Sequence, residues 1–150
     1  MTACPDTSFL CAFYVKQSNS LAAASYAATM KEPLHVTPLL AYEFRQSLRF
    51  QVWRRAGNPS CGVASADMRT ALAQFEADVA DGTTVIVPCS FMAVLNCAED
   101  LSTRHTIASG HRSFDVLHVA AALQLGATVF LTFDGNQRKL ALAHGLAVKP

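Results

Sequence analysis

Residues 110–135, GHRSFDVLHVAAALQLGATVFLTFDG, contain the two elements that decide the fold of this chain. Residues 116–123 are almost wholly apolar, which predicts a helix that is buried on most of its sides. Residues 128–131 form an unbroken apolar run, which predicts a strand in a sheet covered on both faces. One aspartate, Asp115, opens the helix and a second, Asp134, follows the strand. Because carboxylates at the rim of an apolar core need compensating partners, these two acids raise the question of function.

The composition of the chain is that of a compact globular protein. Its 150 residues are enough for one ordinary domain, and 51% of them are hydrophobic while 15% are charged. No basic N-terminal segment precedes a long apolar run, and no apolar stretch is long enough to span a bilayer. We therefore expect a single domain over residues 1–150, a cytoplasmic location and no association with a membrane.

Five cysteines are present, at positions 4, 11, 61, 89 and 97, with no C-x-x-C spacing. An odd number without paired spacing argues against a disulfide framework and against a zinc site. We expect each of them to be a reduced residue in or beside the core. The formal net charge of +1 gives no overall attraction to nucleic acid, so any such binding must come from local clusters of basic residues.

Outside the opening stretch, short apolar strands alternate with helices along the whole chain. Two helix starts are marked most clearly, one by Asp6 and the two hydroxyl residues after it, the other by Thr37 followed by Pro38. We expect strands at 2–4, 34–36, 84–87, 128–131 and 146–148, and helices at 9–15, 21–30, 38–56, 65–79, 90–101 and 137–144. Ser113 is expected to cap the helix of the opening stretch and Gly126 to end it, with a separate short helical piece at 102–106 before it. This alternation predicts an α/β sandwich on a mostly parallel sheet.

Four acids stand out by their positions relative to the predicted strands. Asp6 ends the first strand, Glu43 lies in the helix after the second, and the remaining two flank the late strand as described. In an open parallel sheet, residues at the carboxyl ends of the strands converge on one crevice. Taken singly, each also has an ordinary structural role as a helix cap, a first-turn acid or a solvated helix residue. The grouping is favoured because other acids are expected on exposed helix faces or ends, namely Asp67, Glu76, Asp78, Asp81, Glu99 and Asp100.

A cluster of carboxylates within several ångströms predicts a bound cation, since all of them cannot stay ionised without a counter-charge. Oxygen ligands favour a hard divalent ion, Mg²⁺ or Mn²⁺, which tolerates a few carboxylates plus water and leaves positions for a phosphate. The chemistry that follows is hydrolysis. Metal-bound water becomes more acidic, and the ion stabilises charge on the attacked phosphate and on the leaving oxygen.

Three residues near the acids are candidates for supporting roles. Thr132, two residues before the last acid, points to the same side of the strand, where its hydroxyl can orient a ligand or serve only in packing. Ser8 can hydrogen-bond in the acid cluster or cap a helix. Arg112 can neutralise the cluster or contact a phosphate of the substrate. His118 lies one turn into the alanine-rich helix, and we expect it to be a core histidine rather than a ligand.

The most basic segment follows Glu43 on the same helix. Arg45 and Arg49 lie one turn apart, Phe50 and Trp53 lie close by, and two further arginines follow at positions 54 and 55. This interleaving suits a groove that tracks a nucleic-acid backbone with stacking platforms. It also suits a surface that binds a protein partner, or an ordinary solvated helix face.

The order of the four acids, with Asp6-Thr7-Ser8 near the N-terminus, resembles that of the PIN-domain ribonucleases. The size and spacing are similar to those of VapC-type toxins of bacterial toxin–antitoxin pairs. One subgroup of those toxins is similar to the segment comprising Leu101-Ser102, His105-Thr106, residues 112–123, Thr132-Phe133-Asp134 and Gln137. The resemblance spans nearly the whole chain; it is specific in the C-terminal third and weak between residues 53 and 87.

This resemblance implies a three-layer α/β/α sandwich of the PIN type. It implies that Asp6, Glu43 and Asp115 are metal ligands, with Asp134 completing the site directly or through water. Members of the family cleave single-stranded or loop RNA with Mg²⁺ or Mn²⁺, usually as homodimers, and a cognate antitoxin silences them by covering the site. By this resemblance, Arg45, Arg49 and Trp53 are candidate contacts for RNA or for the antitoxin. Two departures from the usual pattern, a proline directly before the first acid and Gly135-Asn136 where a basic residue is common, remove no ligand.

The sequence leaves other functions open. An RNA- or protein-binding module with a vestigial acidic pocket differs from the enzyme only in turnover, since all four acids are present. An aspartyl phosphotransferase or phosphatase of the haloacid-dehalogenase kind also begins with an aspartate after the first strand, but Ser8 stands where its second acid belongs. A receiver domain needs adjacent acids near the N-terminus and a late lysine at a strand end, and neither is seen.

Overall fold

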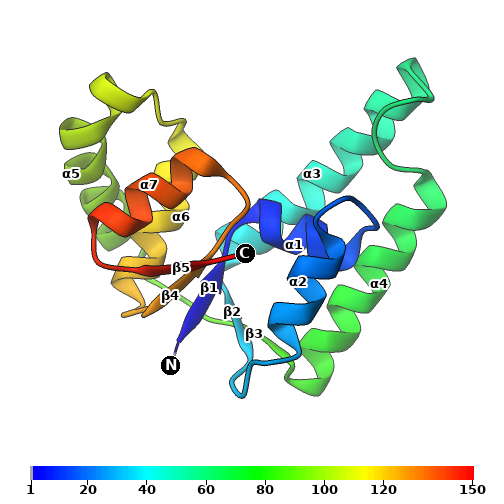
Figure 1. Ribbon diagram of the computed structural model, residues 1–150, viewed down its shortest axis with the longest axis horizontal. Helices are drawn as coiled ribbons and strands as arrows, with labels where there is room; N and C mark the ends of the chain where they lie inside the picture. Colours follow the sequence, from blue (N-terminus) through cyan, green and yellow to red (C-terminus); the bar gives the residue numbers. More distant parts are fainter. Residues whose placement is uncertain (1) are drawn as a thin grey trace.

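The structure, a computed structural model that describes residues 2–150, is built on one five-stranded sheet in which all neighbouring strands pair in parallel (Figure 1). The strands are β1 (Ala3–Pro5), β2 (Leu34–Val36), β3 (Thr84–Ile86), β4 (Val129–Leu131) and β5 (Ala147–Lys149). Their order in the sheet is β3-β2-β1-β4-β5. The chain therefore extends the sheet in one direction from β1 and later in the other, and the crevice of a parallel α/β fold lies at such a switch point.

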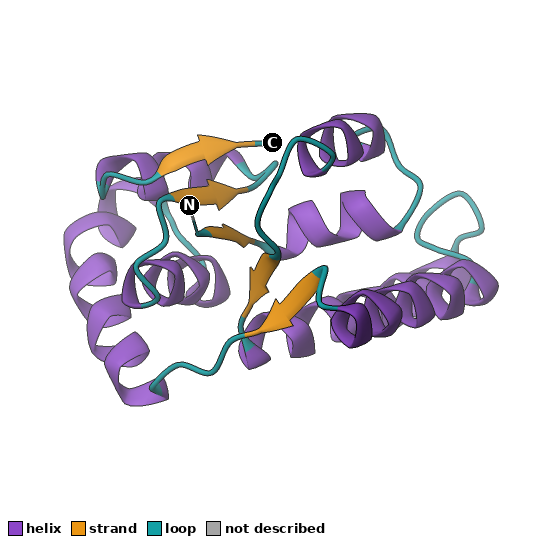
Figure 2. Cartoon of the chain, turned by 90° about the horizontal axis from the view of Figure 1, so that it is seen from below, coloured by secondary structure: helices purple, strands orange, loops and turns teal. Residues whose placement is uncertain are grey.

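Helices cover both faces of this sheet, which runs through the middle of the molecule (Figure 2). They are α1 (Thr7–Tyr14), α2 (Ser20–Ala27), α3 (Pro38–Gly57), α4 (Ser65–Asp81), α5 (Phe91–Ser109), α6 (Ser113–Gln124) and α7 (Gly135–Ala143). Figure 1 shows α5, α6 and α7 together on one side, with α1 to α4 on the other. The prediction of a three-layer α/β/α sandwich with a mostly parallel sheet is confirmed.

The core is divided by the alternation of side chains along the strands. Cys4 and Phe130 point to one face and pack in a cluster with residues of α5, α6 and α7. Their chain neighbours Ala3, Val129 and Leu131 point to the opposite face and pack with α1 and α2. A further cluster joins α1, α3 and α4. The helix of residues 116–123 is buried on most sides as predicted, because it packs between the sheet and α5.

Several helix starts follow from local sequence, whereas two predictions in the C-terminal half are wrong. Asp6 caps α1 and Thr37 caps α3, each accepting a hydrogen bond from the backbone N–H three residues on. The separate helical piece expected at 102–106 is part of α5, which continues until Gly110 adopts a left-handed conformation. Ser113 does not cap α6; Arg112 occupies the cap position, and its side chain makes no capping bond.

Asp78 is another correction, because it is buried and not on an exposed helix face. The hydroxyl of Tyr14 donates a hydrogen bond to Asp78 Oδ2 at 2.7 Å, and Gln74 Nε2 donates to Oδ1 at 2.7 Å. These partners satisfy the carboxylate where α4 packs against α1. Gln74 lies one turn earlier on α4, but Tyr14 comes from the distant helix α1, so local periodicity did not reveal the burial of Asp78.

The cysteines behave as expected. All five are free, and only Cys4 is fully buried. Burial raises the pKa of the Cys4 thiol to about 12, with a smaller contribution from the charge of Cys89. No helix within residues 2–150 combines the length and the apolar character that a membrane crossing requires. The single-domain organisation stays a prediction.

Gly62 gives a test of how tightly the loop between α3 and α4 is packed. Its φ is +73°, and an added Cβ would lie 2.1 Å from the carbonyl oxygen of Gln51. We expect Gly62→Ala to lower the free energy of unfolding by about 2–4 kcal/mol, from backbone strain plus overpacking. Urea unfolding measures the loss.

Gly82→Ala is the matched control. Its φ is +85°, but nothing lies near the added Cβ, so this variant isolates the cost of backbone strain, about 1 kcal/mol. Equal losses would contradict the close contact.

Candidate active site

The four predicted acids come from four separate parts of the chain and lie around one cleft. Asp6 directly follows β1, and Asp134 follows the neighbouring β4. Asp115 lies in the first turn of α6, and Glu43 lies in the second turn of α3. The cleft has a volume of about 340 Å³, and all of these acids except Asp6 line it. Asp6 is 0% exposed and lies behind Ser8 and Gln137, two lining residues that bond to it.

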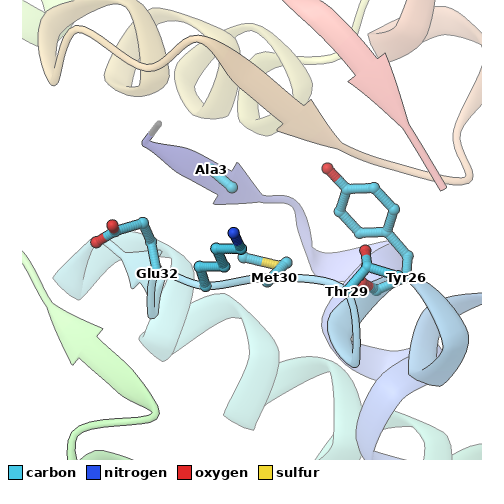
Figure 3. Close-up of a pocket in the computed structure, with 6 residues that line it drawn as sticks. Ala3, Tyr26, Thr29, Met30 and Glu32 are labelled. Carbon is cyan, nitrogen blue, oxygen red and sulfur yellow. The ribbon is translucent and has the colours of Figure 1, made fainter.

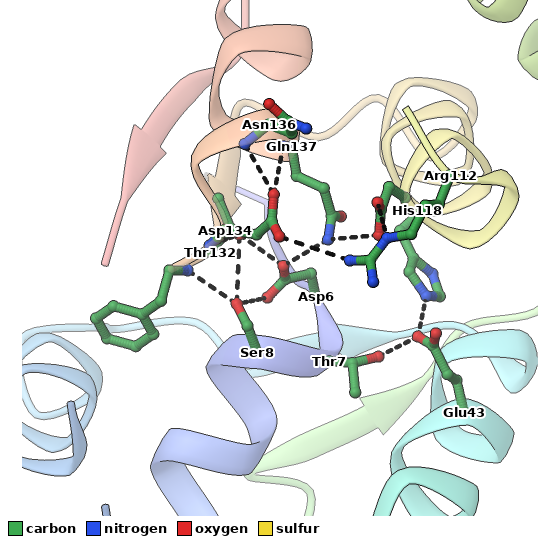
Figure 4. A network of polar contacts seen from close by, with 12 residues as sticks. Asp6, Thr7, Ser8, Glu43, Arg112, His118, Thr132, Asp134, Asn136 and Gln137 are labelled. Carbon is green, nitrogen blue, oxygen red and sulfur yellow. Dashed lines mark hydrogen bonds and ion pairs between the residues drawn. The ribbon is translucent and has the colours of Figure 1, made fainter. Parts of the chain in front are cut away.

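Both oxygens of the Asp6 carboxylate accept hydrogen bonds (Figure 4). Its Oδ1 accepts from Ser8 Oγ at 2.7 Å and from the backbone N–H of Phe9 at 2.8 Å. Its Oδ2 accepts from Thr132 Oγ1 at 2.6 Å and from Gln137 Nε2 at 2.9 Å. The structure thus places Ser8 and Thr132, both predicted as supporting residues, in direct contact with the buried acid.

The ionisation of Asp6 reflects a balance between burial and these bonds. Burial raises its pKa, because a buried carboxylate has lost its hydration. The hydrogen bonds from Thr132, Ser8 and Phe9 act in the opposite direction, as does the charge of His118. Burial prevails, so the site holds a carboxyl whose charge is costly unless a cation is near.

Arg112 is the counter-charge of the two acids in the C-terminal stretch. Its Nε donates to Asp115 Oδ2 at 3.0 Å, and its Nη2 lies 3.8 Å from Asp134 Oδ2. The hydrogen bond and the charge of Asp115 raise the pKa of Arg112. On the other side of Asp115, Gln137 Nε2 donates to Oδ1 at 3.3 Å, so one amide joins Asp6 and Asp115.

Asp134 is both a helix cap and a cleft residue. Its Oδ1 accepts from the backbone N–H groups of Asn136 at 2.8 Å and Gln137 at 2.9 Å, which caps α7. Its Oδ2 is the oxygen that faces Arg112. The capping role and the site role are therefore compatible, because each uses a different oxygen.

Glu43 is held from two sides by Thr7 and His118, whose side chains bond to the same carboxylate oxygen. Burial raises the pKa of Glu43, but the hydrogen bond and charge of His118, with the bond from Thr7, outweigh burial and lower it. His118 is 4% exposed, so it is a buried and satisfied histidine as predicted. The sequence did not indicate that His118 bonds to Glu43, one of the four predicted acids.

Two residues that contact the acids, Thr7 and Gln137, were not predicted to support the site. Gln137 is the third residue of α7, and its position just after Asp134 was the available local signal. Thr7 directly follows Asp6 and was considered only as a possible cap. Both contacts reach across the fold, from α7 to β1 and from α1 to α3.

The donor set suits a hard divalent cation, although the side chains are not gathered into a metal cluster. Within residues 2–150, no three His, Cys, Asp or Glu side chains are close enough together to hold an ion. The guanidinium of Arg112, the amide of Gln137 and the imidazole of His118 lie against the acids in its place. Carboxylate oxygens at such a site are the ligands that Mg²⁺ and Mn²⁺ prefer. The chemistry of these side chains therefore fits such an ion, whereas their spacing in this structure does not form a metal cluster.

The basic segment of α3 divides into paired and free residues. Arg45 donates to Glu76 at 2.6 Å and lies over the ring of Phe75, so it joins α3 to α4. Arg49 and Trp53 are exposed. The contact role predicted for Arg45 must compete with this ion pair, whereas the other two side chains are accessible.

A second cavity of about 340 Å³ lies near the start of β1, away from the acids (Figure 3). It is lined by Ala3, Tyr26, Thr29, Met30, Lys31 and Glu32. None of the four predicted acids contributes to it. The predicted acids therefore belong to the acidic cleft and not to this cavity.

Comparisons with known proteins agree with the architecture. The family model for the PIN domain matches residues 3–142. Among curated proteins, no match was found. VapC20 of Mycobacterium tuberculosis, described as a toxin that cleaves the sarcin–ricin loop, has a similar structure. Its TM-score is 0.69 at 18% identity, covering 99% of this chain and 100% of that one.

Two further crystal structures have the same fold. FitAcB from Neisseria gonorrhoeae has a TM-score of 0.67 at 14% identity and covers 99% of this chain and 97% of that one. VapBC2 from Rickettsia felis, bound to a DNA fragment from its promoter, has a TM-score of 0.66 at 10% identity, with coverage of 99% and 98%. At these identities the likeness establishes the fold and not the activity.

The burial of Asp6 leads us to expect that Asp6→Asn raises stability at neutral pH when a chelator is present. Because the folded-state pKa of Asp6 is raised, its stabilising contribution is complete below the unfolded-state pKa and is lost as the pH rises through the folded-state pKa. The gain in the variant is therefore largest at neutral pH, on the order of 1 kcal/mol, and disappears in acid. Urea unfolding at a series of pH values measures it.

Glu43→Gln is expected to change stability at neutral pH in the direction opposite to Asp6→Asn. The pKa of Glu43 is lowered, so its contribution is present above the unfolded-state pKa and is lost as the pH falls through the folded-state pKa. This variant is expected to be less stable than the wild type at neutral pH and equal to it in acid. If both variants change stability in the same direction, the assigned charge balance is wrong.

Proposed function

The chain belongs to the PIN-domain family, and on that premise we propose that it is a metal-dependent endoribonuclease, the toxin of a toxin–antitoxin pair. One observation carries the proposal: carboxylates on α3, on α6 and after β4 line a single cleft, and the carboxylate of Asp6, after β1, is bonded to two further residues of its lining. Isolated caps or solvated acids have no reason to converge in this way. Bringing these carboxylates together costs electrostatic free energy, and a bound cation that serves catalysis would offset that cost.

The proposed ion is Mg²⁺ or Mn²⁺, held by Asp6, Glu43, Asp115 and Asp134. When bound, such an ion supplies an acidified water and stabilises charge on the attacked phosphodiester and its leaving oxygen. Asp134 retains its cap through Oδ1 and uses Oδ2 for the site. Asp6 is the most enclosed of the four acids, and its carboxylate is bonded to Ser8 and Gln137, two residues that line the cleft.

The remaining residues of the site orient the acids and receive the substrate. Ser8, Thr132 and Gln137 hold the Asp6 carboxylate, while Thr7 and His118 hold Glu43. These bonds limit the rotation of each carboxylate before the ion arrives. The guanidinium of Arg112, which is largely exposed at the cleft, is suited to bind the phosphate of the cleaved strand.

RNA as substrate and an antitoxin as partner are parts of the same proposal. They are supported by family membership and by the toxin description of VapC20, whose fold the chain shares. A homodimer and a cytoplasmic location remain expectations from the sequence.

An observation at the site bears on each alternative function. Arg112 forms ion pairs with two of the acids, and a binding module with a vestigial acidic pocket can contain the same ion pairs. An assay of RNA cleavage therefore distinguishes the enzyme from the binding module. An aspartyl phosphotransferase needs a nucleophilic carboxylate that its substrate can reach. At the position where that chemistry needs its second acid, Ser8 donates a hydrogen bond to Asp6 Oδ1 at 2.7 Å, which disfavours the alternative.

Cleavage of RNA is the direct test. We expect the purified protein to cleave single-stranded RNA in Mn²⁺ or Mg²⁺ and to lose activity in excess chelator. Asp6→Ala and Asp115→Ala are each expected to lower the rate at least about a hundredfold, since they remove a proposed ligand. Asp100→Ala, an exposed acid on α5, is the control and keeps full activity. Circular dichroism checks that the variants fold; an active Asp115→Ala refutes the assigned site.

The position of Arg112 makes the binding of metal testable without activity. Its guanidinium neutralises the same carboxylates that the ion uses, so we expect Arg112→Ala to bind Mn²⁺ about tenfold more tightly. Titration calorimetry without RNA measures the affinity. Arg104→Ala, an exposed arginine on α5, serves as control. Unchanged affinity in Arg112→Ala would show that the guanidinium and the ion do not compete.

A further inference from the structure

The C-terminal end of α3 presents two exposed aromatic side chains that stack on each other. Phe50 is 51% exposed and Trp53 is 69% exposed. Their ring centroids are 5.3 Å apart and the ring planes differ by 26°. We refer to this pair as the α3 platform. Singly exposed hydrophobic side chains are common, but two aromatic rings in contact form one apolar patch, and such patches mark places where something binds.

A preformed hollow adjoins the α3 platform. Its volume is about 370 Å³, and its lining is Trp53, Arg54, Ala56, Gly57, Asn58 and Cys61. The loop that closes it is tied to the helix, because the backbone N–H of Val63 donates to the carbonyl of Gln51 at 3.2 Å. Gly62 packs against the same carbonyl. The shape of the hollow therefore does not depend on a ligand.

The surroundings of the α3 platform are basic. Residues 44–75 contain five arginines and one acid, Asp67. Within residues 2–150, the exposed arginines Arg49, Arg54 and Arg55 form no ion pair, in contrast to Arg45. Unpaired guanidinium groups beside an aromatic surface complement a ligand that combines anionic groups with flat rings.

The α3 platform lies on the same helix as one wall of the acidic cleft, and the cleft and the hollow share no lining residue. Glu43, Ser47 and Gln51 line the cleft and repeat every four residues along one face of α3. Phe50 follows Glu43 by seven residues, so it lies near the same face about 10 Å further along the axis. Trp53 lies about 15 Å along the axis. Figure 1 shows α3 leaving the sheet and carrying this end outward.

We propose that the α3 platform stacks the bases of a single-stranded RNA whose backbone runs from the acidic cleft past Arg54. The proposal rests on the proposed function, since it gives the substrate of that site a second point of contact. Stacking on an aromatic ring accepts any base, so the platform contributes affinity and position rather than sequence choice. A duplex keeps its bases within the stack and cannot use it.

Trp53 is the only tryptophan of the chain, which makes its fluorescence a direct probe of stacking. The binding experiment uses the full chain in excess chelator, so that the RNA is not cut, and a single-stranded homopolymeric RNA. We expect the RNA to quench the fluorescence of Trp53. Trp53→Ala and Phe50→Ala are expected to weaken binding, measured by anisotropy, about tenfold, and Trp53→Phe is expected to restore most of the affinity.

Controls separate stacking from general charge and from loss of the fold. Phe91→Ala removes an aromatic side chain of similar exposure, 57%, on α5 and is expected to leave binding unchanged. A duplex RNA of equal length is expected to give no quenching. Arg54→Gln is expected to reduce the dependence of affinity on salt without abolishing the quenching.

The experiments distinguish failure of the platform proposal from failure of the nuclease proposal. Wild-type cleavage together with unchanged RNA affinity in both alanine variants overturns the platform and leaves the enzyme standing. That result is also the one expected if a protein partner, and not RNA, covers these side chains. Quenching and weakened binding without cleavage in any metal support the platform and overturn the nuclease. Equal quenching by duplex RNA overturns the stacking of unpaired bases.

Discussion

The structure depends on keeping one carboxylate, Asp6, buried at the edge of a parallel sheet. Burial makes its charge unfavourable, and four donors from α1, from the end of β4 and from α7 compensate only in part. Those donors must be held in position. The pairing of β1 with β4 places Thr132 beside Asp6, and the cap of α7 by Asp134 places Gln137 there. The topology of the sheet and the geometry of the site are thus consequences of the same constraint.

The other charges of the site extend this balance outward. Arg112 neutralises Asp115 and Asp134 at the cleft, and His118 pairs with Glu43 from inside the core. Each positive or amide group lies against acids that suit a divalent ion. The three apolar clusters around the sheet offset the free-energy cost of gathering these acids. A site that is costly for the fold and supported on all sides is the usual mark of function.

The helix α3 joins this site to the outer surface. Its first turns carry Glu43 into the cleft, its middle is bound to α4 through Arg45 and Glu76, and its last turns carry the α3 platform. Because a helix of 20 residues is stiff over this length, the distance between cleft and platform is constant. A stiff connection of this kind lets one polymer be held at two points with little loss of conformational entropy.

Local sequence determined the elements of this protein and the positions of its four acids. Each signal that predicted an element acts within a few residues. Examples are the caps at Asp6 and Thr37, the proline at the start of α3, and the short apolar runs that form strands between the helices. Only the tertiary structure decided which groups meet. The contact of His118 with Glu43, the bridge of Gln137 between two acids and the burial of Asp78 against Tyr14 join residues far apart in the chain. Such contacts depend on how the helices pack against the sheet, and the spacing of residues along the sequence does not specify which side chains then come within bonding distance.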